Sequence, residues 1–215
     1  MHPLLQQLGL ETPIIQAPMA GVSTPAMAAA VSNVGALGSI GVGATNATGT
    51  REMIAATRAL TSCPFQVNVV CHRPASADPP REAAWLARLA PEFARYQAAP
   101  PAHLTDIYQS FLADDAKLAV LLETRPAVVS FHFGLPAPER IAALRAAGVT
   151  LFATATNLAD ARAIAAANID TIVAQGYEAG GHRGMFNPAA SDDQLTTAAL
   201  DQRIEATSLT LGVAW

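Results

Sequence analysis

The sequence predicts an α/β protein of the TIM-type (β/α) barrel class, because short β-rich apolar runs alternate with alanine-rich stretches of helical period. One of these runs, residues 65–70, is apolar on both faces apart from two amide side chains, as expected for a strand covered by a core and by outer helices. The runs number six, with a weaker seventh, whereas a closed barrel has eight strands. We therefore expect an incomplete barrel of six to seven strands, forming a single α/β domain over residues 1–215.

The expected strands are short, rich in β-branched residues and bounded by glycine or proline. Each is followed by a stretch long enough for a crossover helix, which favours a parallel sheet. The strands are predicted at residues 13–18, 36–41, 65–70, 127–132, 150–155 and 171–175, with the weaker candidate at 209–213.

Proline, asparagine and glycine set the expected helix boundaries. Pro25 and Pro138 each begin a helix, because proline is favoured in the first helical turn, and Gly35 and Gly148 end these two helices. Asn157 is placed to cap the helix that precedes the sixth strand. With one further helix, the predicted set is 25–33, 51–60, a helix from 138 to before 148, and 158–167.

A stretch far longer than an ordinary crossover follows the third expected strand, over residues 71–125. Helical periodicity at 81–96 and again at 104–122 predicts a helical insertion. Because the stretch begins at the carboxyl end of a strand, where barrel enzymes hold their active sites, we expect it to form a lid or one wall of a substrate pocket. A helical ornament without a chemical role is the alternative.

Composition argues against several classes of partner and location. The net charge is −4 and the 13 Lys and Arg residues are scattered, so nucleic acid is not an expected partner. The most apolar window, 26–44, is interrupted by polar residues and glycines, so we expect no membrane span, and the first residues do not resemble a secretory signal. We expect a cytoplasmic protein, because the two cysteines, Cys63 and Cys71, are too few for a disulfide scaffold and fit a reducing compartment. We expect no metal, because these cysteines and His72 are too few to form a zinc site.

Polar residues stand at the ends of several expected strands. Asn68 lies in the third, His132 ends the fourth and Gln175 ends the sixth, while the segment 18–21 follows the first. The carboxyl ends of barrel strands converge, so these groups are expected to share one pocket. For each of them singly, the alternative is a core residue whose hydrogen bonds are satisfied locally.

The segment 176–184, Gly-Tyr-Glu-Ala-Gly-Gly-His-Arg-Gly, is the most informative stretch of the chain. Paired glycines let the backbone approach a flat or anionic ligand closely, and His182 can exchange a proton near neutral pH. We interpret the segment as a catalytic loop. A mobile glycine-rich turn with a solvent-exposed histidine is the alternative.

Four segments in the same order are similar to motifs of the bacterial nitronate monooxygenases. They are 16–25 (QAPMAGVSTP), 66–74 (QVNVVCHRP), 128–136 (VVSFHFGLP) and 176–184. The resemblance runs from the N-terminus to about Leu200 and implies a TIM-type barrel, FMN as cofactor, and oxidation of alkyl nitronates by O2 to a carbonyl compound and nitrite.

The resemblance also implies residue roles. His182 matches the catalytic base, which in neutral form takes the α-proton of a nitroalkane or orients its nitronate. His132 matches a second active-site histidine near the substrate, and Tyr108 matches a pocket tyrosine, whereas His72 and His103 receive no role. The residues implied to contact FMN are Pro18, Met19, Ala20, Asn68, Gln175, Gly176, Gly180 and Gly181.

The chain departs from this family in its last part. Family members continue through a seventh and an eighth strand whose glycine-rich loops hold the FMN phosphate, and the tail 201–215 does not resemble them. A truncated chain, a frame change or a fragment would each explain this. An unclosed sheet also exposes strand edges, so self-association is expected.

Other functions remain open at this point. An NADH:quinone reductase or an enoyl reductase of the same flavin barrel superfamily would use similar loops, although no motif for a nicotinamide site is found. From a different class, the chain would be an inactive truncated fragment. A phosphate-binding barrel isomerase is disfavoured, because no phosphate loop is present.

Overall fold

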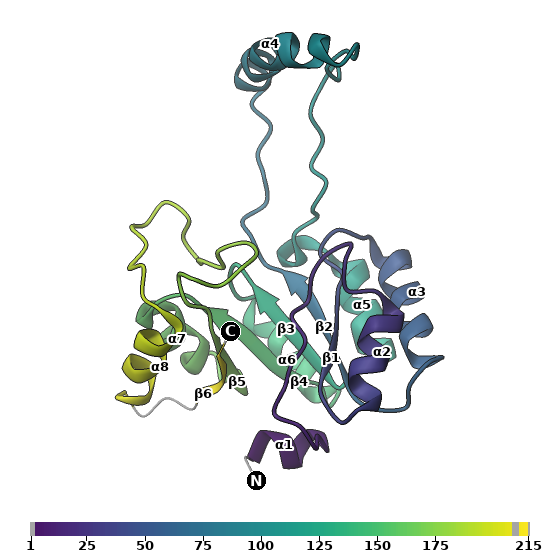
Figure 1. Cartoon of the computed structure of the whole chain (residues 1–215), viewed down its shortest axis with the longest axis vertical. Coiled ribbons are helices and arrows are strands. Elements are labelled where there is room, and N and C mark those ends of the chain that lie inside the picture. Colours follow the sequence, from purple (N-terminus) through teal and green to yellow (C-terminus); the bar gives the residue numbers. More distant parts are fainter. Residues whose placement is uncertain (1–2, 208–210, 215) are drawn as a thin grey trace.

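The computed structural model describes residues 3–207 and 211–214, and six parallel strands within them form one sheet. Each strand pairs with its successor in the chain, and the connections between them carry helices (Figure 1). The strands are β1 (Gly38–Gly41), β2 (Phe65–Val70), β3 (Val128–His132), β4 (Thr150–Ala155), β5 (Thr171–Ala174) and β6 (Leu211–Ala214). The helices are α1 (Pro3–Leu8), α2 (Pro25–Asn33), α3 (Ala47–Arg58), α4 (Pro79–Arg95), the 3-10 helix η1 (Phe111–Ala113), α5 (Asp115–Thr124), α6 (Pro138–Ala146), α7 (Leu158–Ala166) and α8 (Thr197–Glu205).

The sheet is an open part of a barrel, as the sequence predicts. On the side away from β2, the chain before β1 forms an isolated parallel bridge between Ile15 and Leu37. The strand predicted at 13–18 is reduced to this bridge, because Pro13 and Pro18 have no N–H to donate to a ladder. At the other edge, β6 corresponds to the weak seventh strand predicted at 209–213, of which residues 209 and 210 lie outside the described residues.

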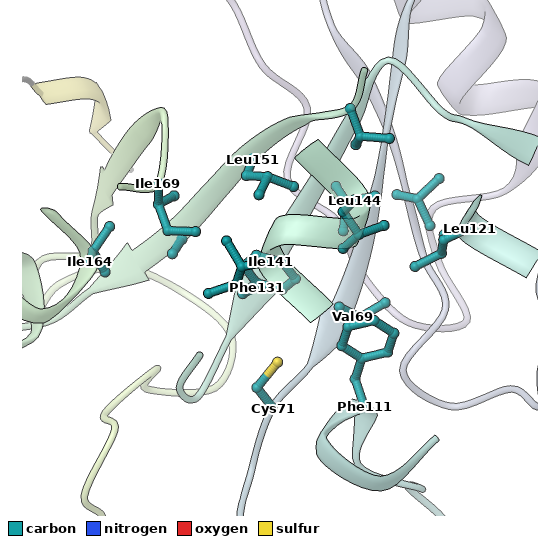
Figure 2. Packing of buried hydrophobic residues seen from close by; sticks show 14 of the residues in the cluster. Val69, Cys71, Phe111, Leu121, Phe131, Ile141, Leu144, Leu151, Ile164 and Ile169 are labelled. Carbon is teal, nitrogen blue, oxygen red and sulfur yellow. The ribbon is translucent and has the colours of Figure 1, made fainter. Parts of the chain in front are cut away.

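The two faces of the sheet have different cores. Val69, Phe131 and Leu151 point toward the helical layer, where they pack with residues of α5, α6 and α7 (Figure 2). Val128 and Phe152 belong to a second, smaller cluster that includes Leu4 and Leu8 of α1. Successive strand residues alternate between these clusters, so the polar residues that alternate with Val69 and Phe131 lie on the inner face of the barrel.

Local capping explains most helix boundaries. The side chain of Asn157 accepts a hydrogen bond from the N–H of Asp160 at 2.8 Å, so the predicted N-cap of α7 is confirmed. Gly148 follows α6 with φ +82°, a left-handed conformation that strongly favours glycine. α3 begins at Ala47 rather than at 51, because the side chain of Asn46 caps it through the N–H of Gly49.

The long excursion after β2 divides into two parts. α4 lies far from the sheet at the end of two extended segments (Figure 1), and none of its residues is buried. The helix predicted at 104–122 is shorter than expected, since residues 101–110 are irregular and α5 begins at Asp115. The side chain of Asp114 caps α5, and this helix packs against α3 and α6 in the outer layer.

Candidate functional site

Polar side chains from neighbouring strands form the inner face at the carboxyl end of the sheet. Asn68 of β2 and Ser130 of β3 are paired in register, and Asn68 Nδ2 donates to Ser130 Oγ at 2.8 Å and to the Ser130 carbonyl at 3.3 Å. Thr154 lies near the end of β4 and Gln175 directly follows β5. Asn68, His132 and Gln175 therefore come from three separate strands and lie on one face of the sheet.

The loop after the first strand segment lies at the end of β1. Met19 N–H donates to Ser23 Oγ at 2.9 Å, and Ser23 Oγ donates to the carbonyl of Ala17 at 3.1 Å, so this turn is fixed by its own residues. A Cβ on Gly41 would lie 3.2 Å from the nitrogen of Ala20, so the loop passes close to the strand end. Met19 is 42% exposed, which leaves its side chain accessible to a ligand at this edge.

The glycine-rich segment 176–184 crosses the ends of β3, β4 and β5. Gln175 Nε2 donates to the carbonyl oxygen of His182 at 3.0 Å, and the N–H of Gly184 donates to Gln175 Oε1 at 2.7 Å. His132 Nε2 lies 3.1 Å from the same carbonyl oxygen of His182. The two histidines of the motifs therefore lie together, at one edge of one sheet.

The environments of the two imidazoles differ. His132 is partly buried, and its desolvation lowers its pKa, while its Nδ1 lies 3.1 Å from Thr154 Oγ1. His182 is exposed, and no residue in the described part of the chain hydrogen-bonds to its ring nitrogens. The ring of Phe133 makes edge contacts with both, at centroid distances of 4.3 Å from His132 and 6.1 Å from His182. Of these two imidazoles, only that of His182 has ring nitrogens without a hydrogen-bond partner among the described residues.

Arg183 fixes the segment from its other side. Its guanidinium forms two hydrogen bonds of 2.8 Å with the carboxylate of Asp192, and this contact holds the pKa of Asp192 below its usual range. The same group donates to the carbonyls of Gln175 at 2.5 Å and Thr156 at 3.2 Å. Arg183 therefore connects the segment to the ends of β4 and β5.

Three of the four glycines of the segment have different surroundings. A Cβ on Gly176 would lie 2.2 Å from the nitrogen of Thr197, so this glycine lets the chain pack against the start of α8. Gly181 has φ +77°, and a Cβ on Gly180 or Gly181 would meet nothing within 4 Å. Gly180 and Gly181 therefore border open space, whereas Gly176 contacts protein.

Tyr108 lies in the irregular segment that leads back from α4, and it is 38% exposed. Its backbone N–H donates to Asp106 at 3.1 Å, and the hydroxyl of Ser110 donates to the carbonyl of His72 at 2.5 Å. No described contact joins Tyr108 to His132 or His182.

Several residues of the site had no role in the sequence analysis. Phe133 has φ +67°, a strained conformation for a non-glycine residue, directly after the strand-end histidine. Thr154 and Gly184 contact His132, and Asp192 orients Arg183. The sequence signal for Phe133 is its position before Gly134 at a strand end, but the partners of Gly184 and Asp192 depend on the path of a loop.

Two buried polar atoms on the inner face have no hydrogen-bond partner among the described residues. They are Oγ of Ser39 and Oε1 of Gln66, which are paired in register on β1 and β2. Buried polar groups without partners are costly, so such atoms commonly mark a place where a ligand or water binds. The described part of the chain contains no cluster of three metal-ligating side chains and no helix long and apolar enough to span a membrane.

Comparison with known families gives a match over nearly the whole chain. The family model described as nitronate monooxygenase matches residues 2–211, a range that extends beyond Leu200, where the motif resemblance was expected to end. A nitronate monooxygenase from Paraburkholderia phytofirmans is 64% identical over 197 residues, which is 92% of this chain and 54% of that protein. One from Pseudomonas aeruginosa is 52% identical over 199 residues, 93% of this chain and 57% of that protein.

Solved structures with the same arrangement include a nitroalkane oxidase from Streptomyces ansochromogenes, with a TM-score of 0.86 and 39% identity. That alignment covers 98% of this chain and 59% of the other. FabK from Thermotoga maritima aligns with a TM-score of 0.67 and 27% identity, over 98% of this chain and 52% of the other. The chain spans about half the length of the curated relatives that it matches.

Proposed function

Because this chain belongs to the nitronate monooxygenase family, we propose that it is a flavin-dependent oxidoreductase that binds FMN and oxidises alkyl nitronates with O2 to a carbonyl compound and nitrite. The observation that supports this most directly is the presentation of His182. Its backbone is held by two side chains at the strand ends, while its ring nitrogens have no protein partner in the described structure. An imidazole placed in this way is available to a small molecule.

The proposed role of His182 is that of a general base. A neutral imidazole accepts the α-proton of a nitroalkane, and a protonated one attracts an anionic nitronate electrostatically. Phe133, whose ring contacts both histidine rings, adds an apolar wall that would exclude water from one side of the substrate. Both features suit a small substrate with one charged and one apolar end.

The residues at the strand ends fit a bound FMN. Gly180 and Gly181 border open space, so a flat ring could approach their backbone, and Met19 and Ala20 lie at the same edge. Asn68, which lies closer to the carboxyl end of β2 than Gln66 does, supplies a hydrogen-bonding side chain on the inner face. When bound there, FMN supplies the electron chemistry, which no side chain of this site can provide.

A first experiment compares His182→Gln with a matched substitution, His103→Gln, on an exposed segment outside the site. The chain is supplied with FMN and a neutral primary nitroalkane, whose α-proton the base must remove, and nitrite release and O2 uptake are measured. We expect the His182 variant to lose about 100-fold or more in rate, the usual contribution of a general base, and the His103 variant to match the wild type. A His182→Gln rate equal to wild type would refute the proposed role.

Cofactor affinity is the second property to test. We propose that this chain binds FMN through the residues at the strand ends, where Gly180 and Gly181 border open space and Met19 is exposed. A flavin titration followed by fluorescence measures the dissociation constant of the complex. The absence of saturable binding would contradict this proposal.

The remaining alternatives separate in the same assays. A reductase of the same superfamily would reduce the flavin with NADH rather than with a nitronate, and anaerobic bleaching of the flavin band distinguishes the two donors. An inactive fragment would give neither. Self-association through the open edge of the sheet is a further proposal, tested by the mass of the chain in light scattering over a range of concentrations.

A further inference from the structure

We infer that His132 and Gln175 act together as a clamp on the backbone carbonyl of His182, which makes His132 a positioning residue and not a proton carrier. This inference rests on the proposed function, because it concerns how the base of that reaction is oriented. It changes the role that the family resemblance implies for His132, a direct partner of the substrate. The geometry around one carbonyl oxygen carries the inference.

The carbonyl oxygen of His182 accepts two side-chain hydrogen bonds. Gln175 Nε2 lies at 3.0 Å and His132 Nε2 at 3.1 Å, one for each lone pair of the oxygen. The Gln175 amide also accepts the N–H of Gly184 at 2.7 Å, so it holds the segment on both sides of residue 183. The backbone that carries the His182 side chain is thus fixed at two points.

The same bonds decide the protonation of His132. A carbonyl oxygen can only accept, so Nε2 of His132 must carry a hydrogen. Nδ1 then faces Thr154 Oγ1 at 3.1 Å, and this hydroxyl can donate to it. Both ring nitrogens are occupied by protein groups, and neither is left to exchange a proton with a ligand. Burial lowers the pKa of His132 and favours the same neutral form.

Gly184 shows that the imidazole of His132 fits tightly in this position. A Cβ at residue 184 would lie 2.6 Å from Cε1 and 3.0 Å from Nδ1 of the ring, closer than side-chain carbons approach each other. The backbone of the segment therefore lies directly against the ring. Two contacts, the carbonyl of His182 and the bare Cα of Gly184, hold the ring and the segment together.

Arg183 completes the arrangement from outside. It donates to the carbonyl of Gln175 at 2.5 Å and is itself oriented by Asp192. Gln175 is therefore held by its backbone while its side chain holds His182. Rigid strand ends determine the position of His182 through this chain of contacts, and the glycines before it supply no such restraint.

The test uses two amide replacements of His132 that differ in reach. The amide nitrogen of glutamine reaches the position of Nε2, whereas that of asparagine reaches only the position of Nδ1. His132→Gln keeps a donor for the His182 carbonyl, and His132→Asn removes it. His103→Gln serves as a control outside the site. If His132 acted by proton transfer, both replacements would remove that function equally, because neither amide can exchange a proton as an imidazole does.

The first readout is amide hydrogen exchange at Gly184, measured by NMR on the whole chain without flavin. Losing one net hydrogen bond should speed exchange about three- to tenfold in His132→Asn, while His132→Gln should stay within about twofold of wild type. Equal exchange rates in the two variants would overturn the clamp. This readout needs no activity, so it decides the inference even if the proposed function fails.

The second readout is the rate of nitroalkane oxidation with FMN present. We expect His132→Gln to keep kcat within about tenfold of wild type and His132→Asn to lose more, with KM changed little in either. If His132→Gln instead loses kcat as severely as His182→Gln while Gly184 stays protected, His132 takes part in the chemistry and the inference is wrong. An inactive wild-type chain would count against the proposed function alone.

Discussion

Substituting Gly184 by alanine should damage the site by displacing a histidine more than 50 residues away in the sequence. The added Cβ would lie 2.6 Å from Cε1 of His132 and 3.1 Å from Cγ2 of Thr154. The ring cannot move away freely, because its two nitrogens are bonded to Thr154 and to the carbonyl of His182. Either the segment or the ring must therefore shift.

The size of the effect follows from these contacts. Overpacking by one methyl group in a well-packed region costs about 1–3 kcal/mol. If the ring moves instead, two hydrogen bonds of about 0.5–1.5 kcal/mol each are lost, which gives a similar range. A cost near 2 kcal/mol lowers the melting temperature of a chain of this size by about 4–8 °C.

Thermal unfolding followed by circular dichroism measures this cost, and Gly180→Ala is the matched control. A Cβ on Gly180 meets nothing within 4 Å, and its φ is not in the left-handed region, so the control should melt with the wild type. Flavin titration should then separate the variants further, because Gly180 borders the space proposed for FMN. If Gly184→Ala melted at the wild-type temperature, His132 would not be held as tightly as the structure indicates.

Three further predictions concern stability and reactivity. Arg183→Lys should destabilise the chain by about 1.5–3 kcal/mol in urea unfolding, because lysine cannot reproduce the two-pronged contact with Asp192, and an unchanged midpoint would contradict this. The pKa of His132 is lowered in the folded chain, so as the pH falls the unfolded chain binds a proton at this residue first. The contribution of His132 to stability should therefore be complete above about pH 6.5 and should decrease as the pH falls toward its folded pKa. His132→Gln should lack this part of the pH dependence in urea midpoints compared at pH values on either side of about 6.5. Cys71 is 2% exposed and burial raises its pKa, so a thiol reagent should label the half-buried Cys63 in the native chain and Cys71 only after unfolding.

The strands could be predicted from sequence because their apolar runs are local signals. The run at 150–155 is β4 without change, and the run at 65–70 is β2. The first run failed as a strand because prolines bound it, and its partner at Leu37 is reached through one bridge. Helical periodicity at 104–122 was misleading for its first half, since residues 101–110 are irregular.

The candidate site could be predicted in part for a different reason. The convergence of Asn68, His132 and Gln175 follows from parallel strands alone, because their carboxyl ends share one edge. The hydrogen bonds that His132 and Gln175 form with residues 182–184 do not follow, because they depend on where the segment 176–184 crosses that edge. Glycine spacing identifies this segment as unusual, but only its path shows that Gln175 and His132 both bond to His182.

This division has a consequence for how substitutions at Gln175 should be interpreted. The resemblance implies that Gln175 contacts the flavin. In the structure, however, the nitrogen and the oxygen of its side-chain amide both form hydrogen bonds with the segment 182–184. A Gln175→Ala variant would therefore lose flavin chemistry in either case, through a lost ligand contact or through a displaced His182. The two causes differ at Gly184, whose amide exchange should rise in the chain without flavin only if the side chain holds the segment. A measurement of flavin binding alone would therefore assign Gln175 to the cofactor site, although its hydrogen bonds hold the backbone around His182.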